Sequence, residues 1–244
     1  MNSVVTQELS RFNGLIVQIR NSLMNLKLAI KGEVLLSSEL EFALKQIKDG
    51  RVPDLWLSKS YPSLKTLGSY VKDLADRLTF FQTWIDTTFP EFYWINKFFF
   101  TQGFMTGALQ NYARRKKLPI DKLTLDFEVV FDEENAKAPE EGVHVKGMYM
   151  EGFKWEPTAR TVAESDGKIL FSDCPMVWFK PCLRVDKATE GIYEAPLYRT
   201  MERKGTLATT GHSTNFVLKV SLPSDRPKSH WIKRGAAMIC ALTD

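Results

Sequence analysis

The chain has 244 residues, of which 44% are hydrophobic and 25% are charged, and both fractions are ordinary for a globular protein. Length and composition together exclude global disorder and the collagen-like and low-complexity classes, and they predict one or two domains. The net charge of +4 is too small to indicate a nucleic-acid partner.

We find no targeting signal in the sequence. No apolar stretch approaches the ~18 residues that a membrane-spanning helix needs, and Met1–Glu8 lacks the basic and apolar regions of a secretory signal. We therefore expect no membrane partner. The three cysteines cannot all pair within one molecule, which favours a reducing intracellular compartment and a cytoplasmic location.

Charge and proline content change near residue 118. Residues 1–117 carry 16 Lys and Arg against 10 Asp and Glu, whereas residues 118–244 carry 17 against 19. Only three of the 11 prolines precede Pro119. We therefore predict a helical subdomain over residues 1–117 and a strand-rich subdomain over residues 118–244.

The apolar positions of the first region have helical spacing. Ser38 and Glu41 have the spacing of a capping box and predict a short helix that ends at Gly50. A further helix is predicted from Leu64 to Ile85, broken by Pro90. Before both, steps of three and four residues predict one long helix with a single buried face, formed by Leu9, Phe12, Ile16, Ile19, Leu23, Leu26 and Ile30.

Residues 80–100 contain ten of the 29 aromatic residues of the sequence. Such a run is typical either of a partner-binding platform or of a hinge between helices, with buried rings. We favour the buried hinge, because an exposed aromatic patch of this size promotes aggregation.

A last helix is predicted from Asn96 to Lys117. It ends in four consecutive cations, which are candidate docking residues for phosphates or for an acidic protein surface: Arg114, Arg115, Lys116 and Lys117. Cations in the last turn of a helix also interact favourably with its dipole, so capping explains their location. Four cations in a row exceed what capping needs, and the docking hypothesis therefore stands beside the capping one.

From Leu123 the apolar residues alternate along the sequence. Residues 123–129 and 143–150 predict two half-buried strands, with an acidic, solvated loop at 132–142 between them. Short apolar runs follow at 168–171, 176–179, 192–198, 216–222 and 236–242. Six or seven short strands without intervening helical patterns predict an antiparallel β-barrel or sandwich, and hence an α+β protein.

No catalytic, cofactor-binding or metal site is predicted. The glycine-rich phosphate-binding loops and the nucleophile elbow of hydrolases are absent from the sequence. Cys174 and Cys182 are eight residues apart. Structural zinc sites usually use cysteine pairs with only about two to four residues between them, which is three to five positions apart. A thiol hydrolase that pairs Cys182 with His212 remains an alternative, since such residues meet only in the fold.

Five strings of residues are more specific than these patterns. They are Ser60–Lys65 (SYPSLK), Phe98–Phe104 (FFFTQGF), Leu118–Asp121 (LPID), Gly205–Phe216 (GTLATTGHSTNF) and His230–Gly235 (HWIKRG). Through them the whole sequence resembles the C-terminal region of a dynein heavy chain of the axonemal kind.

The resemblance implies helices followed by an antiparallel β-barrel, in agreement with the residue patterns. In that family the region lies across one face of the motor's AAA+ ring, is non-catalytic and is thought to modulate the ring's motion. The ring hydrolyses ATP and a separate stalk binds microtubules, but the ring, its Walker motifs and the stalk are absent from this sequence.

The expected partner is therefore the AAA+ ring of the parent heavy chain, with other axonemal dynein subunits contacted indirectly. The expected location is the axoneme of a cilium or flagellum. The alternatives are a self-contained protein-interaction module and the thiol hydrolase.

Overall fold

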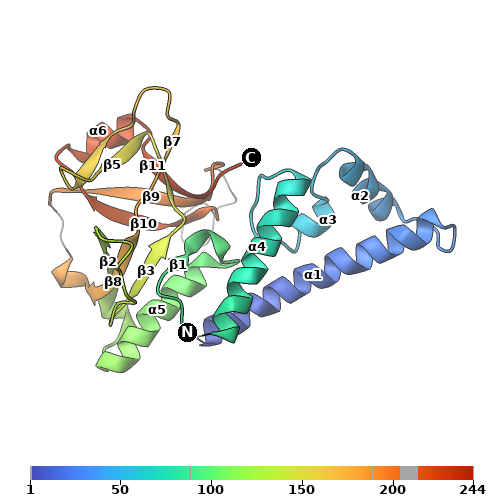
Figure 1. The fold of residues 1–244 in the computed structure, drawn as a ribbon, viewed down its shortest axis with the longest axis horizontal. Coiled ribbons are helices and arrows are strands. Elements are labelled where there is room, and N and C mark those ends of the chain that lie inside the picture. Colours follow the sequence, from blue (N-terminus) through green and yellow to red (C-terminus); the bar gives the residue numbers. More distant parts are fainter. Residues whose placement is uncertain (1, 88, 188–189, 204–213, 244) are drawn as a thin grey trace. The chain divides into compact units, whose positions relative to one another are not determined.

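The computed structural model describes residues 2–87, 89–187, 190–203 and 214–243. Their contacts divide the protein into two compact units, whose elements are shown in Figure 1. The helical unit comprises residues 2–87, 97–100 and 243, and the strand unit comprises the described residues within 89–96 and 101–242. The protein therefore has an α+β fold that begins with helices, as predicted. None of the helices in the described ranges has the length and apolar content needed to span a bilayer.

α1 spans Asn2–Ile30, which confirms the first predicted helix, but its buried stripe differs from the predicted one. Leu23 and Ile30 are exposed. Strict alternation of steps of three and four has a period of ~3.5 residues and drifts around a helix by about 20° per heptad. The predicted face therefore leaves the core toward the end of α1. The buried residues follow the helical period instead and are Val4, Glu8, Phe12, Leu15, Ser22 and Leu26.

α2 spans Ser38–Lys48, and its cap is one residue earlier than predicted. The Ser37 hydroxyl, on extended backbone, accepts a hydrogen bond from the Leu40 N–H at 3.3 Å. Two successive serines satisfy the same sequence preference, so the pattern alone did not distinguish them. Gly50 ends the helix as predicted, with a left-handed φ of 70°.

Aromatic rings form the core of the helical unit, which is completed by α3 (Asp54–Leu57) and α4 (Leu67–Asp86). The Phe12 ring lies 5.6 Å from that of Phe81 and 5.4 Å from that of Phe99, between centroids. The aromatic residues at 80–100 include four buried ones, Phe81, Trp84, Tyr93 and Phe98, and three exposed ones, Phe89, Trp94 and Phe100. Burial is therefore confirmed for the first group only.

Two buried charged side chains hold residues 97–100 within the helical unit. The Glu8 carboxylate, which is 1% exposed, accepts hydrogen bonds from the backbone N–H groups of Phe99 and Phe100. Arg77 pairs with Asp73 at 2.6 Å and donates to the Phe98 carbonyl at 3.3 Å. Patterns of apolar residues do not reveal such contacts, because both side chains are charged.

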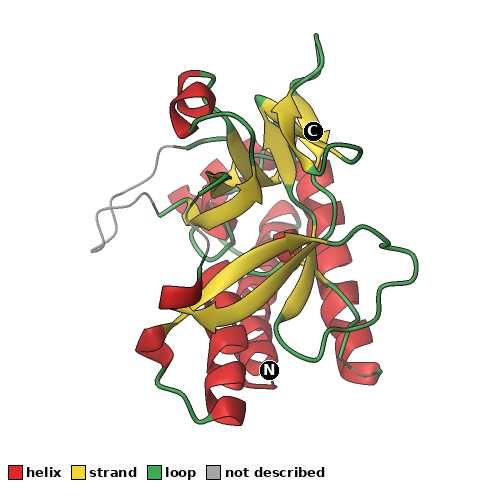
Figure 2. Cartoon of the chain, turned by 90° about the vertical axis from the view of Figure 1, so that its left-hand side faces the viewer, coloured by secondary structure: helices red, strands yellow, loops and turns green. Residues whose placement is uncertain are grey.

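The strand unit holds a four-stranded sheet, a five-stranded sheet and one separate strand pair, seen in yellow in Figure 2. Their orders are β1-β3-β8-β2, β10-β9-β11-β4-β7 and β5-β6. The strands are β1 (Tyr93–Trp94), β2 (Leu123–Val129), β3 (Val143–Lys146), β4 (Tyr149–Glu151), β5 (Phe153–Glu156), β6 (Thr161–Glu164), β7 (Phe171–Asp173), β8 (Val177–Leu183), β9 (Ile192–Thr200), β10 (Phe216–Pro223) and β11 (Ala237–Ala241).

The prediction of a purely antiparallel barrel or sandwich is wrong. No barrel closes among the described strands, and β1 pairs with β3, and β9 with β11, in parallel. Alternation reports which face of a strand is buried and not the direction of its neighbour. Between the parallel strands β9 and β11 the chain passes through β10 and the short helix α6 (Lys228–Lys233). α6, β1, β5 and β6 were not predicted from the sequence.

The strand predicted at 143–150 is in fact two strands in different sheets. Gly147 separates β3 from β4 with a left-handed φ of 82°. A Cβ atom at this position would lie 2.9 Å from the Asn96 side chain and 3.0 Å from that of Trp94. The turn between the sheets therefore requires glycine.

The last predicted helix is α5 (Thr101–Lys116), which belongs to the strand unit. It buries Phe104, Met105 and Ala108 and contacts β2 and β8. Short 3-10 turns at Ile95–Lys97 and Ile120–Lys122 flank it, and a third at Arg184–Asp186 follows β8. The predicted subdomain boundary at residue 118 stays a prediction.

Candidate docking surface

The four predicted docking cations lie at the C-terminal end of α5, and all four are exposed. Lys117 leaves the helix with a left-handed φ of 55°. The Leu118 N–H donates a hydrogen bond to the Ala113 carbonyl at 2.9 Å. This is the 6→1 hydrogen bond, spanning five residues, that defines a Schellman motif. This turn ends α5 and keeps the four cations in its last turn and the residue after it.

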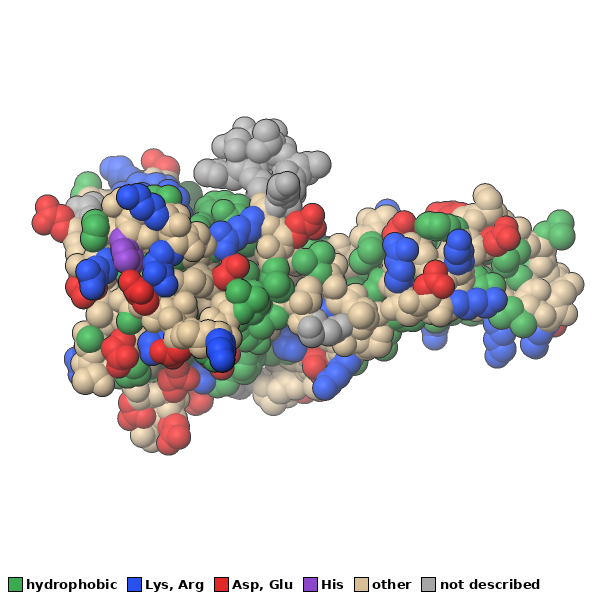
Figure 3. All heavy atoms as spheres, turned by 90° about the horizontal axis from the view of Figure 1, so that it is seen from above, with side chains coloured by type: hydrophobic (Ala, Val, Ile, Leu, Met, Phe, Trp, Pro, Cys, Tyr) green, Lys and Arg blue, Asp and Glu red, His purple; other side chains and the backbone are tan. Residues whose placement is uncertain are grey.

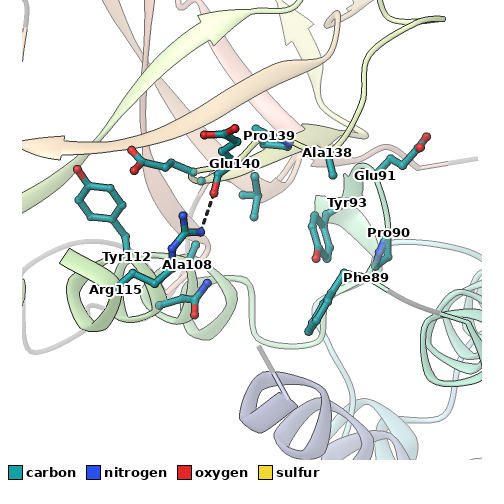
Figure 4. A pocket seen from close by; sticks show the side chains of 14 residues that line it. Phe89, Pro90, Glu91, Tyr93, Ala108, Tyr112, Arg115, Ala138, Pro139 and Glu140 are labelled. Atoms are coloured by element: carbon teal, nitrogen blue, oxygen red, sulfur yellow. Dashed lines mark hydrogen bonds between the residues drawn. The ribbon is translucent and has the colours of Figure 1, made fainter. Parts of the chain in front are cut away.

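The acidic loop at 132–142 binds two of these cations. Arg115 Nη1 donates to the Glu140 carbonyl oxygen at 2.7 Å, drawn as the dashed line in Figure 4. Lys116 Nζ lies 2.5 Å from Glu141 Oε1, and this hydrogen bond and the glutamate charge raise the pKa of Lys116. The loop was predicted only as solvated, yet it supplies the partners of half of the basic run.

The loop is in turn tied to the sheet behind it. Glu133 pairs with Lys146 at 2.7 Å, and Trp178 Nε1 donates to the Glu141 carbonyl at 2.7 Å. Gly142 ends the loop with a φ of 77°, and a Cβ there would lie 2.2 Å from a carbonyl oxygen of β8. These contacts give Arg115 and Lys116 fixed partners.

Arg114 and Lys117 are the other two cations, and both remain available. Neither forms a salt bridge or a side-chain hydrogen bond with any residue that the structure describes. A single exposed ion pair contributes only about 0–1 kcal/mol. Any contact that the two cations make with an acidic surface is therefore expected to be modest in energy and to weaken as salt rises.

A cavity of about 240 Å³ lies beside Arg115. Figure 4 shows Phe89 and Tyr93 on one side of it, Tyr112 and Arg115 on the other, and Pro139 of the acidic loop above them. Burial raises the pKa of Tyr93 to about 12, so its hydroxyl stays protonated at neutral pH. The volume is below the ~300–1,000 Å³ of small-molecule sites.

The helical unit exposes large apolar side chains near the end of α1. Ile30 is 73% exposed and Leu35 is 95% exposed, and Val34 and Leu36 lie in the same segment. Green and blue side chains are interspersed at the right-hand end of Figure 3, over this part of the unit. Scattered apolar residues are ordinary on a surface, whereas a group of them is typical of a protein contact.

The described thiols and imidazoles do not support hydrolase chemistry. Burial raises the pKa of the Cys182 thiol, which opposes formation of the nucleophilic thiolate. Its candidate partner His212 lies outside the described residues, as does most of the string Gly205–Phe216. No group of three or more His, Cys, Asp or Glu side chains converges as metal ligands would in the described ranges. The absence of a metal and of catalysis stays a prediction.

The acidic partners Glu140 and Glu141 were not predicted from the sequence. A signal for them was present, because a run of cations and a run of acidic residues are separated by one strand. When the backbone turns back after the strand, the acidic residues that follow the strand can come close to the cations that precede it. The aromatic walls of the cavity gave no such signal, since Phe89 and Tyr112 are 23 residues apart in the sequence.

The family model for the C-terminal domain of the dynein heavy chain matches residues 1–240. The sequence is 48% identical to dynein axonemal heavy chain 12 of Rattus norvegicus over 242 residues and 50% identical to dynein axonemal heavy chain 3 of Homo sapiens over 245 residues. It is 44% identical to dynein axonemal heavy chain 1 of Homo sapiens over 244 residues.

Each alignment covers 99% of this protein, but it covers only 8%, 6% and 6% of these relatives, respectively. The 244 residues therefore span less than a tenth of the relatives' length. The protein belongs to the family of dynein C-terminal domains, and its similarity is to axonemal heavy chains.

Proposed function

We propose that this dynein C-terminal domain docks on the AAA+ ring of its parent heavy chain and modulates the motion of an ATP-driven, microtubule-based motor. The observation that carries the proposal is similarity along almost the entire sequence to axonemal heavy chains. The exposed cations Arg114 and Lys117 and the apolar end of α1 support a docking role.

Such a domain acts on the motor through differences in contact energy. A module that touches the ring stabilises those ring arrangements in which its contacts are better. Each ~1.4 kcal/mol of difference changes the equilibrium between two arrangements about tenfold. The domain itself supplies no catalytic group in this proposal, and ATP hydrolysis belongs to the parent heavy chain.

The proposed location follows from the same similarity. The relatives are named as axonemal heavy chains, so we place the domain in the axoneme of a cilium or flagellum. Other axonemal dynein subunits are then reached indirectly, through the parent heavy chain.

The basic run divides into two pairs, and this division makes docking testable. The recombinant AAA+ ring of the parent heavy chain, made without this domain, serves as the probe. The R114Q/K117Q variant removes the two cations that have no partner among the described residues, and we expect it to weaken ring binding about three- to tenfold at low salt. Since exposed charges are screened over about 8–10 Å at physiological salt, the difference shrinks as salt rises.

The R115Q/K116Q variant is the matched control, because it removes the same charge from cations that the acidic loop already binds. We expect a smaller effect on ring binding from it. Absence of binding by the unsubstituted protein at low salt would refute ring docking. Equal losses in the two variants would refute the role assigned to Arg114 and Lys117.

The purified protein is also expected to hydrolyse no ATP. ATP turnover that a point substitution in it abolishes would contradict the assignment of the activity to the parent heavy chain.

A further inference from the structure

The cavity beside Arg115 belongs entirely to the strand unit and is walled by aromatic rings. Phe89 and Tyr93 lie on one side of it, and Tyr112 of α5 lies on the other (Figure 4). The face of an aromatic ring carries negative partial charge and attracts a cation that lies within about 6 Å of the ring centre. Three rings around one cavity therefore favour a positively charged group as its occupant.

The lining of the cavity is also negatively charged. Among the described residues, its charged members are Glu91, Glu140, Glu141 and Arg115. Arg115 offsets one of the three carboxylates, and Lys116, which pairs with Glu141 at 2.5 Å, offsets another. Glu91 and Glu140 are exposed, and neither forms a salt bridge with any residue that the structure describes. The lining thus keeps a net negative charge, which is complementary to a cation.

One ammonium group is already bound at the edge of this cavity. Lys116 Nζ lies 2.5 Å from the Glu141 carboxylate and 5.9 Å from the centre of the Tyr112 ring. Both partners of this ammonium group also line the cavity. A carboxylate and an aromatic ring therefore bind a cation together at this place. The cavity offers the same combination again in Glu91, which is two residues from both Phe89 and Tyr93 in the sequence.

The walls of the cavity are held in place by contacts within the strand unit. Tyr93 is 5% exposed and lies on β1, which pairs with β3. Arg115 and Trp178 donate hydrogen bonds to the carbonyls of Glu140 and Glu141, both at 2.7 Å. These bonds fix the acidic loop against α5 and β8. An occupant therefore does not have to order the site, which lowers the free-energy cost of binding.

We propose that this cavity binds the side chain of an arginine residue of a partner protein. The guanidinium group stacks on the aromatic walls, and the exposed carboxylates of Glu91 and Glu140 bind its charge. Arginine is favoured over lysine, because guanidinium is planar, stacks on aromatic rings and is less strongly hydrated than ammonium. The volume of about 240 Å³ admits the end of one long side chain, whereas small-molecule sites have ~300–1,000 Å³. The proposal does not depend on ring docking or on Arg114 and Lys117.

The probe is arginine blocked at both ends, as N-acetyl-arginine N-methylamide, which presents the side chain as a peptide does. Its binding to the full 244-residue protein is followed by NMR, through the backbone amides of Asn111, Tyr112, Gly142 and Val143, which line the cavity. We expect saturable shifts with a Kd on the order of 1–10 mM, because one side chain supplies the whole affinity. The affinity should fall as salt rises. Blocked citrulline has nearly the same shape without the charge, and it should give no saturable shift in the same concentration range.

Two charge variants test the carboxylates. E91Q/E140Q removes the two carboxylates of the lining that have no salt bridge among the described residues, and it should weaken binding of blocked arginine about three- to tenfold. E128Q/E134Q is the matched control. It removes the same charge from one exposed residue of β2 and one of the acidic loop, neither of which lines the cavity, and it should leave binding nearly unchanged.

Two further variants test the rings and the space between them. Tyr112 is half-buried, and Y112L keeps an apolar wall but removes the ring face, so binding should weaken about two- to fivefold. Ala138 is exposed in the acidic loop and lines the cavity. A138W therefore fills the cavity without removing a core contact, and it should abolish binding. Thermal unfolding of each variant checks that it is folded.

Four outcomes would overturn the proposal. They are equal binding of blocked arginine and blocked citrulline, equal losses in E91Q/E140Q and E128Q/E134Q, undiminished binding by A138W, and no saturable shift in the unsubstituted protein. None of these measurements uses the AAA+ ring, Arg114 or Lys117, so their failure leaves the proposed function standing.

Discussion

Gly142 is the residue at which one methyl group decides whether the acidic loop can close on β8. We expect G142A to destabilise the protein by about 2–5 kcal/mol, because a left-handed backbone and an overlap with a carbonyl oxygen add together. Gly191 is the matched control, with a φ of 66° and no atom within 4 Å of a built Cβ. G191A should cost only about 1–2 kcal/mol. Urea unfolding measures both. Equal losses would contradict the role of the Phe179 carbonyl, which is the β8 oxygen that a Cβ at Gly142 would overlap.

His144 makes stability depend on pH. It is 8% exposed on β3, its ring lies edge-on to Trp178 at 6.4 Å, and its Nδ1 finds no hydrogen-bond partner among the described residues. Burial lowers the pKa of His144 below its ordinary value of 6.5. The unfolded state then binds more protons than the native one, so stability is lost as pH falls below that value.

The H144L variant should therefore lose less unfolding free energy than the unsubstituted protein between about pH 7.5 and pH 5.5. The control is H230Q, which removes an imidazole that lies 3.2 Å from the Glu164 carboxylate and leaves His144 in place. It should retain the loss of stability that His144 causes. Equal losses in H144L and the unsubstituted protein would show that His144 is not the group that titrates.

At the scale of the element, α5 ends at a residue whose backbone conformation is unfavourable for a side chain. Lys117 adopts the left-handed conformation that favours glycine. K117G should stabilise the protein by about 1 kcal/mol. R114G removes a cation from the helix itself and should destabilise it by a similar amount, because glycine disfavours the helix interior. Thermal unfolding compares the two, and a loss of stability in K117G would mean that the lysine side chain has a structural role.

The acidic loop and the end of α5 form one linked pair of elements. R115Q/K116Q removes the side chains that donate to Glu140 and Glu141, so we expect faster proteolysis within residues 132–142. R114Q/K117Q has no such contacts to lose and should leave the cleavage rate unchanged. Unaltered cleavage in R115Q/K116Q would indicate that Glu133, Trp178 and Gly142 hold the loop without the helix.

Local patterns predicted the elements well where one face of each meets one core. The apolar spacing found α1, α2 and α4, and alternation found β2 with its ends as observed. The last helix was predicted from Asn96, but α5 begins only at Thr101. α6 escaped because six residues are too few to show a helical period. The buried polar stripe of Glu8 and Ser22 in α1 escaped because both residues break an apolar pattern.

At the scale of the whole molecule, pairing direction and charge partners lay beyond the sequence. The parallel pair of β9 and β11 depends on the path through β10 and α6, which residue alternation does not encode. The basic run of the candidate site could be predicted because its four cations are consecutive in the sequence. Its division into a bound pair and an available pair required the position of the loop, which the fold determines.

The grouping of α5 with the strands leads to a prediction about which fragment folds. α5 buries Phe104, Met105 and Ala108 within the strand unit and contacts β2 and β8. Burial of one Phe or Met side chain contributes ~1.5–3 kcal/mol, and a whole domain is stable by only ~5–15 kcal/mol. A fragment of residues 118–244, cut at the predicted subdomain boundary, therefore lacks enough stability to fold.

A fragment of residues 89–244 keeps α5 and should unfold in one cooperative urea transition. Phe98 and Phe99 pack on rings of the helical unit, so both are changed to serine in this fragment to keep it soluble. The shorter fragment begins after Phe98 and Phe99 and needs no such change. Its far-ultraviolet circular dichroism should change gradually with urea concentration. A cooperative transition of equal midpoint in both fragments would show that the strands fold without α5, and it would place the subdomain boundary at residue 118.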